Sequence, residues 1–232
     1  GEYFDPKVNE NGNEYQETGY MTDILTDKAV SWLKEKRDPN KPFSLNLWHK
    51  AVHQPHTPAA RHTNLYENED LPTPPYDTHK ETFKGKPKWQ RKKTFGFDWK
   101  KNLPIPLELP EMEWPINYDR SMDLLRCLAA IDESLGTVLA TLEELGELDN
   151  TVVIYSSDNG YFMGEHTFLD KRLAYENSMR VPMLIRYPKL IKKNSKVKEQ
   201  CLNIDLAPTI LSPAGITVPN YMQGESMVNL LN

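Results

Sequence analysis

The chain has 232 residues, of which 38% are hydrophobic, and its formal net charge is -5 at pH 7. This length suits one α/β domain with a sizeable core, and the negative charge excludes a general attraction to nucleic acid or to an anionic membrane surface. The sequence has no apolar run long enough to cross a membrane, and its first residues lack a signal-peptide pattern. Cys127 and Cys201 have no Cys/His spacing that would suggest zinc, and we expect both to be buried thiols.

The first half of the chain predicts one helix, one strand and a long irregular segment. An amphipathic helix is expected from Thr22 or Asp23 to about Arg37, followed by a short strand over residues 42–48. Prolines recur between residues 59 and 117, where no periodicity persists. We therefore expect an irregular insert at about 59–117.

The second half predicts a regular alternation of helices and strands. Residues 118–145 have the clearest helical period, with Gly146 as the stop, and strands are expected at 151–156 and 181–186. A last helix is expected from Asp205 to Leu211. This order predicts the α/β class, with a mostly parallel sheet sandwiched by helices. The polar start at Gly1 and the end at Asn232 suggest an excerpt, incomplete at both ends, of a longer domain.

Ligand sites of open α/β sheets form beyond the carboxyl ends of the strands, so the segments after the predicted strands are the candidates. After the first strand, residues 49–58 contain three histidines, one lysine and two prolines. After the second, Asp158 and Asn159 present two oxygen ligands that suit a hard cation, and Gly160 permits a turn. Solvated histidines and an ordinary turn are the alternative interpretations of these two segments.

A third loop, residues 164–176, is crowded with ionisable side chains. Lys171 is a candidate anion-binding residue, or else a surface lysine paired with a neighbouring acid. Glu165 and His166 border a candidate site, although a hydrogen bond that stabilises the loop is an equal alternative for both. Glu176 and Arg180 are four residues apart and are expected to form a structural ion pair.

An ordered series of motifs resembles the sulfatase family of the alkaline-phosphatase superfamily, from about Tyr20 onward. The series begins with the interval from Phe43 to His53 and continues with these segments in family order: Ser157-Asp158-Asn159-Gly160, Gly164-Glu165-His166, Lys171 with Tyr175-Glu176, Arg180-Val181-Pro182, Asn203 to Leu211, Ala214-Gly215-Ile216 and Gln223 to Ser226. Each motif is weak alone, whereas the series is specific. The resemblance implies an alkaline-phosphatase-like fold and makes residues 1–232 the middle and C-terminal part of a sulfatase catalytic domain.

The resemblance also implies a role for each matching residue. Asp158 and Asn159 look like calcium ligands, with Asp158 also near the nucleophile, and Lys171 looks like the lysine that binds the sulfate. His53 looks like the proton donor to the departing alcohol, with His56 as the alternative, and both histidines and His166 would contact the substrate. A cation, a lysine and a histidine suit the cleavage of a sulfate ester, because each stabilises negative charge on its oxygens.

Two parts of the family's site are absent from the sequence. The attacking formylglycine is made within Cys-x-Pro-Ser-Arg or Ser-x-Pro-Ser-Arg, and neither motif occurs here, nor do the early paired aspartates that complete the calcium site. We therefore expect the chain alone to be inactive, with the formylglycine outside it.

The resemblance favours a sulfuric ester hydrolase that acts on a sulfated carbohydrate of the glycosaminoglycan or mucin type. It is similar to the N-acetylglucosamine-6-sulfatase branch, whose members are secreted, periplasmic or lysosomal, and it implies no nucleic-acid partner and no transmembrane segment. A phosphodiesterase or phosphonate hydrolase of the same superfamily is one alternative. A non-catalytic fragment or glycan-binding relative is another.

Overall fold

A computed structural model describes residues 2–70, 85, 94–98, 103–106, 118–163, 165, 169–171 and 173–231, with the backbone alone at 94–98, 103–106, 118–121 and 169–170. The chain forms two compact units. The first comprises Gly1–Leu145 and Tyr161–Leu173, and the second comprises Gly146–Gly160 and Ala174–Asn232. Most of the expected insert at 59–117 lies outside the described residues.

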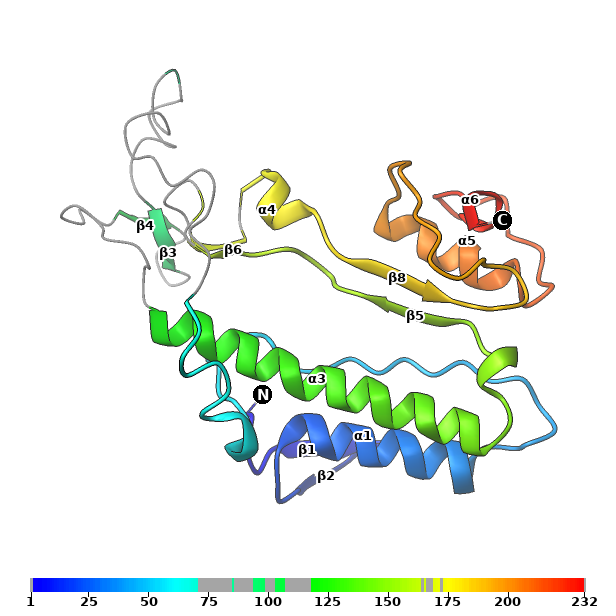
Figure 1. The fold of residues 1–232 in the computed structure, drawn as a ribbon, viewed down its shortest axis with the longest axis horizontal. Helices are drawn as coiled ribbons and strands as arrows, with labels where there is room; N and C mark the ends of the chain where they lie inside the picture. Colours follow the sequence, from blue (N-terminus) through cyan, green and yellow to red (C-terminus); the bar gives the residue numbers. More distant parts are fainter. Residues whose placement is uncertain are drawn as a thin grey trace. The chain divides into compact units, whose positions relative to one another are not determined.

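Two helices that lie side by side form the centre of the first unit (Figure 1). Helix α1 spans Met21–Ser31 and continues as a π-helical turn over Trp32–Lys36, while α3 spans Tyr118–Glu144. Both helices were predicted, and Gly146, with a φ of 70°, follows the end of α3 as expected. The start of α1 differs from the prediction, because the helix begins after Tyr20 and the side chain of Thr22 is fully buried in it.

The buried face of α3 consists mainly of small and hydroxyl side chains rather than of leucines. Its most buried residues are Met122, Cys127, Ala130, Ser134, Thr141 and Leu142. Thr26 of α1 and Ser134 of α3 are joined by a hydrogen bond of 2.6 Å between their hydroxyl oxygens. Leu128 and Leu145, expected on the buried stripe, are 37% and 36% exposed. The small side chains allow the two helix backbones to approach closely.

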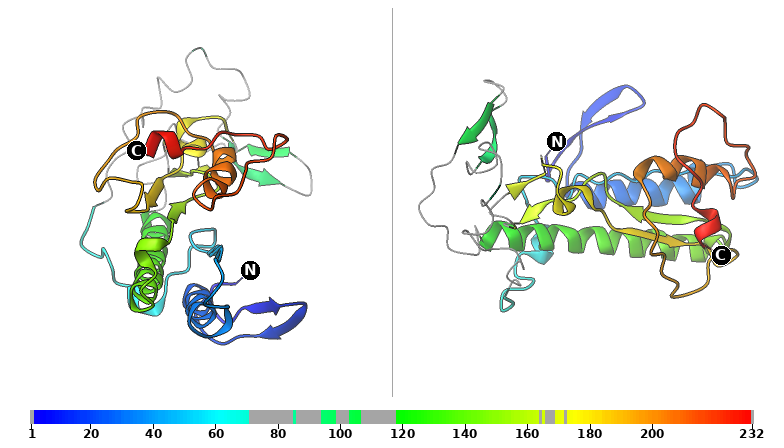
Figure 2. Two further views of the ribbon diagram at one scale, coloured as in Figure 1. Left: turned by 90° about the vertical axis from the view of Figure 1, so that its right-hand side faces the viewer. Right: turned by 90° about the horizontal axis from the view of Figure 1, so that it is seen from above.

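Short antiparallel strand pairs complete the first unit. Strands β1 (Lys7–Glu10) and β2 (Asn13–Gln16) form a hairpin that projects from the two helices (Figure 2). Its two-residue loop is Asn11-Gly12, and both residues have a positive φ, which is the geometry that hairpin loops require. The other pairs are β3 (Thr94–Asp98) with β4 (Leu103–Pro106), and β6 (Phe162–Met163) with β7 (Leu169–Asp170). A 3₁₀ turn spans Ala60–His62.

The second unit is built on one pair of strands. Strand β5 (Val153–Ser156) runs antiparallel to β8 (Met183–Arg186), with Ser156 opposite Met183 (Figure 1). Both strands were predicted. The short helices are α4 (Glu176–Met179), α5 (Leu206–Leu211) and α6 (Val228–Leu231), and 3₁₀ turns span Leu148–Asn150 and Asn203–Asp205. Asp205 accepts the backbone N–H of Leu202 through Oδ2, at 2.8 Å, so its side chain caps the 3₁₀ turn rather than α5.

Two details of the predicted sheet differ in the described residues. Every described strand pair is antiparallel, whereas the sequence predicted mostly parallel pairing. Residues 42–48 form no strand, although the exposure of residues 43–48 alternates as it does in a strand. The segment is extended, but no described strand offers it hydrogen bonds. None of the described helices is long and apolar enough to cross a membrane.

Candidate active site

The loop that contains His53 belongs to the first unit and is held by its own backbone. The backbone N–H of His53 donates to Lys50 O at 3.0 Å, and its carbonyl accepts the hydroxyl of Tyr3 at 2.6 Å. Burial raises the pKa of Tyr3, so this phenol stays a donor throughout the physiological range. The His53 side chain itself is exposed. The loop therefore presents an accessible imidazole on a fixed backbone.

The hydrogen bonds of His53 lie at Nδ1, which is 2.7 Å from Gln54 O and 3.0 Å from Lys50 Nζ. A carbonyl only accepts and an ammonium only donates, so these two contacts favour opposite tautomers of the ring. Nε2 has no hydrogen-bond partner among the described residues and is the ring nitrogen that is available to a substrate.

His56, the alternative proton donor, lies in the same loop. Its Nδ1 donates to Val52 O at 2.9 Å, and its ring meets the ring of Tyr161 edge-on, with 6.2 Å between the centroids. Gln54 bonds the hydroxyl of the same tyrosine at 2.7 Å. His56 is half-buried, whereas His53 is exposed, and this difference favours His53 as the group that reaches a substrate.

His49, the third histidine of the loop, is committed to the packing of α1 and α3. Thr26 donates to Thr22 O at 2.7 Å, so Ser134 must donate to Thr26, and His49 Nε2, 3.2 Å away, must donate to Ser134. Burial lowers the pKa of His49, which keeps the ring neutral. This histidine orders a chain of hydroxyl groups and has no free donor.

Lys171 lies in the first unit together with His53 and near Lys50, a residue that the sequence analysis did not assign. The Lys50 pKa is lowered by burial and then by the charge of Lys171. The structure therefore places Lys50 Nζ 3.0 Å from His53 Nδ1, and the charge of Lys171 acts on Lys50. His166 lies outside the described residues, and Glu165 accepts the backbone N–H of Met163 at 2.6 Å, which confirms its interpretation as a loop-stabilising residue.

Asp158 and Asn159 form a tight turn after β5 in the second unit. Asp158 Oδ1 accepts the backbone N–H of Asn159 at 2.9 Å, and Asn203 donates to the carbonyl of Asp158 at 3.3 Å. Gly160 is needed for a reason that the sequence did not suggest. A Cβ at this position would lie 2.2 Å from Asn177 O, so only glycine fits against the backbone of α4.

This turn fits a hard cation as part of its ligand set. Asn159 Nδ2 donates to Gly160 O at 2.6 Å, which leaves the amide oxygen available, and Asp158 Oδ2 accepts no hydrogen bond from the described residues. Calcium takes six to eight oxygen ligands. No group of three or more His, Cys, Asp or Glu side chains able to hold a metal occurs among the described residues, so this turn alone supplies only two ligands.

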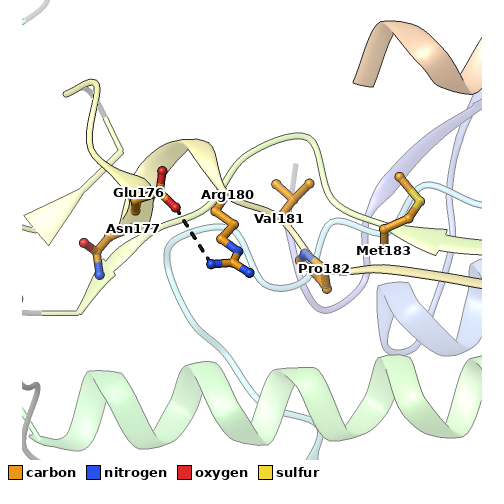
Figure 3. Close-up of a pocket in the computed structure, with 6 residues that line it drawn as sticks. All are labelled: Glu176, Asn177, Arg180, Val181, Pro182 and Met183. Carbon is orange, nitrogen blue, oxygen red and sulfur yellow. Dashed lines mark ion pairs between the residues drawn. The ribbon is translucent and has the colours of Figure 1, made fainter. Parts of the chain in front are cut away.

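A hollow of about 510 Å³ lies in the second unit beside α4 (Figure 3). Glu176 and Arg180 point toward each other there, with 3.9 Å between Oε2 and Nη1, and their side chains are 80% and 83% exposed. The predicted structural ion pair is confirmed. Its exposure limits its contribution to stability, and none of the proposed catalytic residues lines this hollow.

The two cysteines occupy different environments. Cys127 is completely buried, as predicted, and burial raises the pKa of its thiol. Cys201 is half-buried, which corrects the expectation of a fully buried thiol, because it lies in a segment whose residues 192–200 and 202–204 are exposed. Neither cysteine forms a disulfide.

Comparison with known proteins matches residues 2–216 to the sulfatase family model. An N-acetylglucosamine-6-O-sulfatase of Bacteroides thetaiotaomicron is 35% identical over all of this chain and 49% of its own length. An extracellular sulfatase homolog of Drosophila melanogaster is 30% identical over 99% of the chain and 20% of its own length.

A solved structure shares the same fold over most of the chain. It is 32% identical, with a TM-score of 0.78, and the match covers 99% of this chain and 55% of that protein. That protein was captured with its substrate, D-glucosamine-2-N,6-O-disulfate. The chain thus spans about half the length of the Bacteroides sulfatase and of the solved structure, and it has the expected alkaline-phosphatase-like fold.

Proposed function

The chain belongs to the sulfatase family, and from this premise we propose that the protein hydrolyses the sulfate ester of a sulfated carbohydrate. The observation that carries the proposal is the group formed by His53, Lys50 and Lys171, which lies within a match to the family over residues 2–216. Two lysines and a histidine suit an anionic substrate, because they stabilise negative charge on its oxygens.

Each residue has a separate task in this proposal. Lys171 binds the sulfate group and neutralises charge on the leaving oxygen. His53 donates a proton from Nε2 to the departing alcohol, with its ring oriented by the bond between Nδ1 and Gln54 O. His56 is the alternative donor, and both histidines and His166 contact the sugar side of the substrate.

Asp158 and Asn159 would hold two ligand positions of a calcium ion, through one carboxylate oxygen and one amide oxygen. When bound, calcium would supply positive charge to the nonbridging oxygens of the sulfate. The remaining ligands and a formylglycine would come from outside residues 1–232, since the formylglycine motif does not occur in them. By this proposal the chain alone releases no sulfate.

The substrate class follows from the relatives rather than from a pocket. One relative is named as an N-acetylglucosamine-6-O-sulfatase, and a solved relative binds a glucosamine that carries two sulfates. We therefore propose a glucosamine-containing glycan of the glycosaminoglycan or mucin type as the substrate. One relative is named extracellular, so we also propose a secreted, periplasmic or lysosomal protein.

The test uses the natural gene product that carries residues 1–232. Its kcat/KM is measured on N-acetylglucosamine 6-sulfate, on an aryl sulfate and on an aryl phosphate diester, with the 232-residue chain assayed in parallel. We expect sulfate release from both sulfate esters at rates well above those on the phosphate diester, and no release by the 232-residue chain. A clear preference for the phosphate diester would instead identify a phosphodiesterase or phosphonate hydrolase. The absence of any turnover would contradict the proposal and favour a non-catalytic fragment or glycan-binding relative.

A further inference from the structure

Lys50 is a cation in the His53 loop that has no acidic partner. Its Nζ lies 3.0 Å from Gln54 O and 3.0 Å from His53 Nδ1, and it sits 5.5 Å from the centre of the Tyr3 ring. Among the described lysines of the first unit, no carboxylate forms an ion pair with Lys50, whereas at least one does so with each of Lys7, Lys28, Lys34, Lys36 and Lys41.

The number of donors on Lys50 exceeds the number of acceptors around it. Two possible acceptors, Gln54 O and His53 Nδ1, each lie 3.0 Å from its Nζ. An ammonium group has three N–H donors, so at least one donor of Lys50 has no acceptor among the described residues.

A second lysine adds to the positive charge at this place. Lys171 is near enough for its charge to lower the pKa of Lys50, beyond the larger effect of burial. Among the described residues Lys171 has no ion-pair partner either. Two lysines without acids repel each other, and a bound anion would remove that repulsion while accepting the unused donors.

We propose that Lys50 and Lys171 together bind the sulfate group of the substrate, with Lys50 as a second sulfate-binding lysine beside His53. The inference rests on the proposed function for the identity of the anion.

The first experiment measures the chemical acetylation of individual lysines in the natural gene product by mass spectrometry. Inorganic sulfate is titrated at constant ionic strength, with chloride as the other salt. We expect sulfate to slow the modification of both Lys50 and Lys171 with one common Kd. The modification of Lys193, an exposed lysine of the second unit, should not change. Equal labelling of Lys50 in saturating sulfate and in chloride overturns the proposal.

A second experiment measures, in variants of Lys50, how well sulfate protects Lys171 from acetylation. Lys50→Met keeps the length of the side chain but removes its charge and donors, so the Kd for sulfate should rise about tenfold or more. Lys50→Arg should keep the Kd within about threefold, and Lys193→Met should not change it. Protection of Lys171 that is unchanged in Lys50→Met overturns the proposal. The wild-type labelling decides the question even if this variant fails to fold.

Glucosamine 6-sulfate and glucosamine distinguish a sugar sulfate from free sulfate. We expect the sulfated sugar to protect Lys50 and the unsulfated sugar to leave it reactive, and protection by both sugars alike would contradict the inference. Failure of the proposed function gives a different result, in which sulfate protects Lys50 but the protein releases no sulfate from any ester. Sulfate release with no protection of Lys50 removes this inference alone.

Discussion

At Gly160 the backbone of the turn that carries Asp158 and Asn159 passes directly against α4. The Gly160 N–H donates to Ser178 O at 2.9 Å, and the space where a Cβ would sit is occupied by two carbonyl groups, those of Asn177 and Arg180. The two oxygen ligands are thus placed by a close backbone contact within the second unit. Their position depends on a residue that has no side chain.

Gly160→Ala should lower the free energy of unfolding, because the new Cβ would lie 2.2 Å from Asn177 O and 2.7 Å from Arg180 O. Overpacking against backbone atoms costs about 1–3 kcal/mol. The matched control is Gly136→Ala in α3, where a Cβ meets no atom within 4 Å and alanine should stabilise the helix by about 0.5–1 kcal/mol. Urea unfolding followed by circular dichroism measures both. Equal stability changes in the two variants would contradict the account of Gly160.

At the scale of elements, a network of charged side chains ties the 60–62 turn to both long helices of the first unit. Arg61 contacts Asp23 of α1 through two hydrogen bonds of 2.8 Å and Glu133 of α3 through one of 2.7 Å. His62 Nε2 lies 2.9 Å from the other oxygen of Glu133. The turn that follows the His53 loop is thereby fixed to the helix pair.

The network predicts how stability depends on pH. The hydrogen bond from Arg61 is the largest cause of the lowered pKa of Glu133, whose ordinary value is 4.5. A lowered pKa in the folded state stabilises the fold above the ordinary pKa, and this contribution is lost as the pH falls through the lowered value. Below about pH 4.5 the free energy of unfolding should therefore fall, and it should fall less in Arg61→Ala.

Thermal unfolding at a series of pH values from 7 to 3 measures this difference. Arg180→Ala is the matched control, because its ion pair with Glu176 is exposed and 3.9 Å long and should contribute little at any pH. If Arg61→Ala and the wild type lose the same stability between pH 7 and pH 3, Arg61 does not stabilise the ionised form of Glu133 in the folded protein.

For the molecule as a whole, the sequence predicted the order of elements better than their contacts. Helices α1 and α3 and strands β5 and β8 follow from periodicity and β-branched content, which are local properties. The extended segment at 42–48 was predicted as a strand, but strand pairing depends on a distant partner that local pattern does not identify. The buried face of α3 was also predicted wrongly. A prediction from hydrophobicity assigns leucines to the buried face, whereas the two helices pack through small side chains that let their backbones approach.

The residues of the candidate site that belong to sequence motifs could be named from the sequence, whereas those defined by three-dimensional contacts could not. His53, Lys171, Asp158 and Asn159 come from ordered motifs, whereas Lys50 stands out only once its donors and acceptors are counted in three dimensions. The task of His49 likewise follows from its hydrogen bond with Ser134, a residue far from it in sequence. The signal for Lys50 in the sequence is its place three residues before His53, in the same strand-end loop.

The most direct test of the central claim is the rate of sulfate release from N-acetylglucosamine 6-sulfate by Lys171→Ala of the natural gene product. Loss of one charge-stabilising group should reduce kcat by about 10²–10³-fold. Lys193→Ala, which removes an exposed lysine of the second unit, should retain the wild-type rate. An active wild type with equal kcat in both variants would contradict the assignment of Lys171, and with it the proposal that this chain supplies charge stabilisation to sulfate ester hydrolysis.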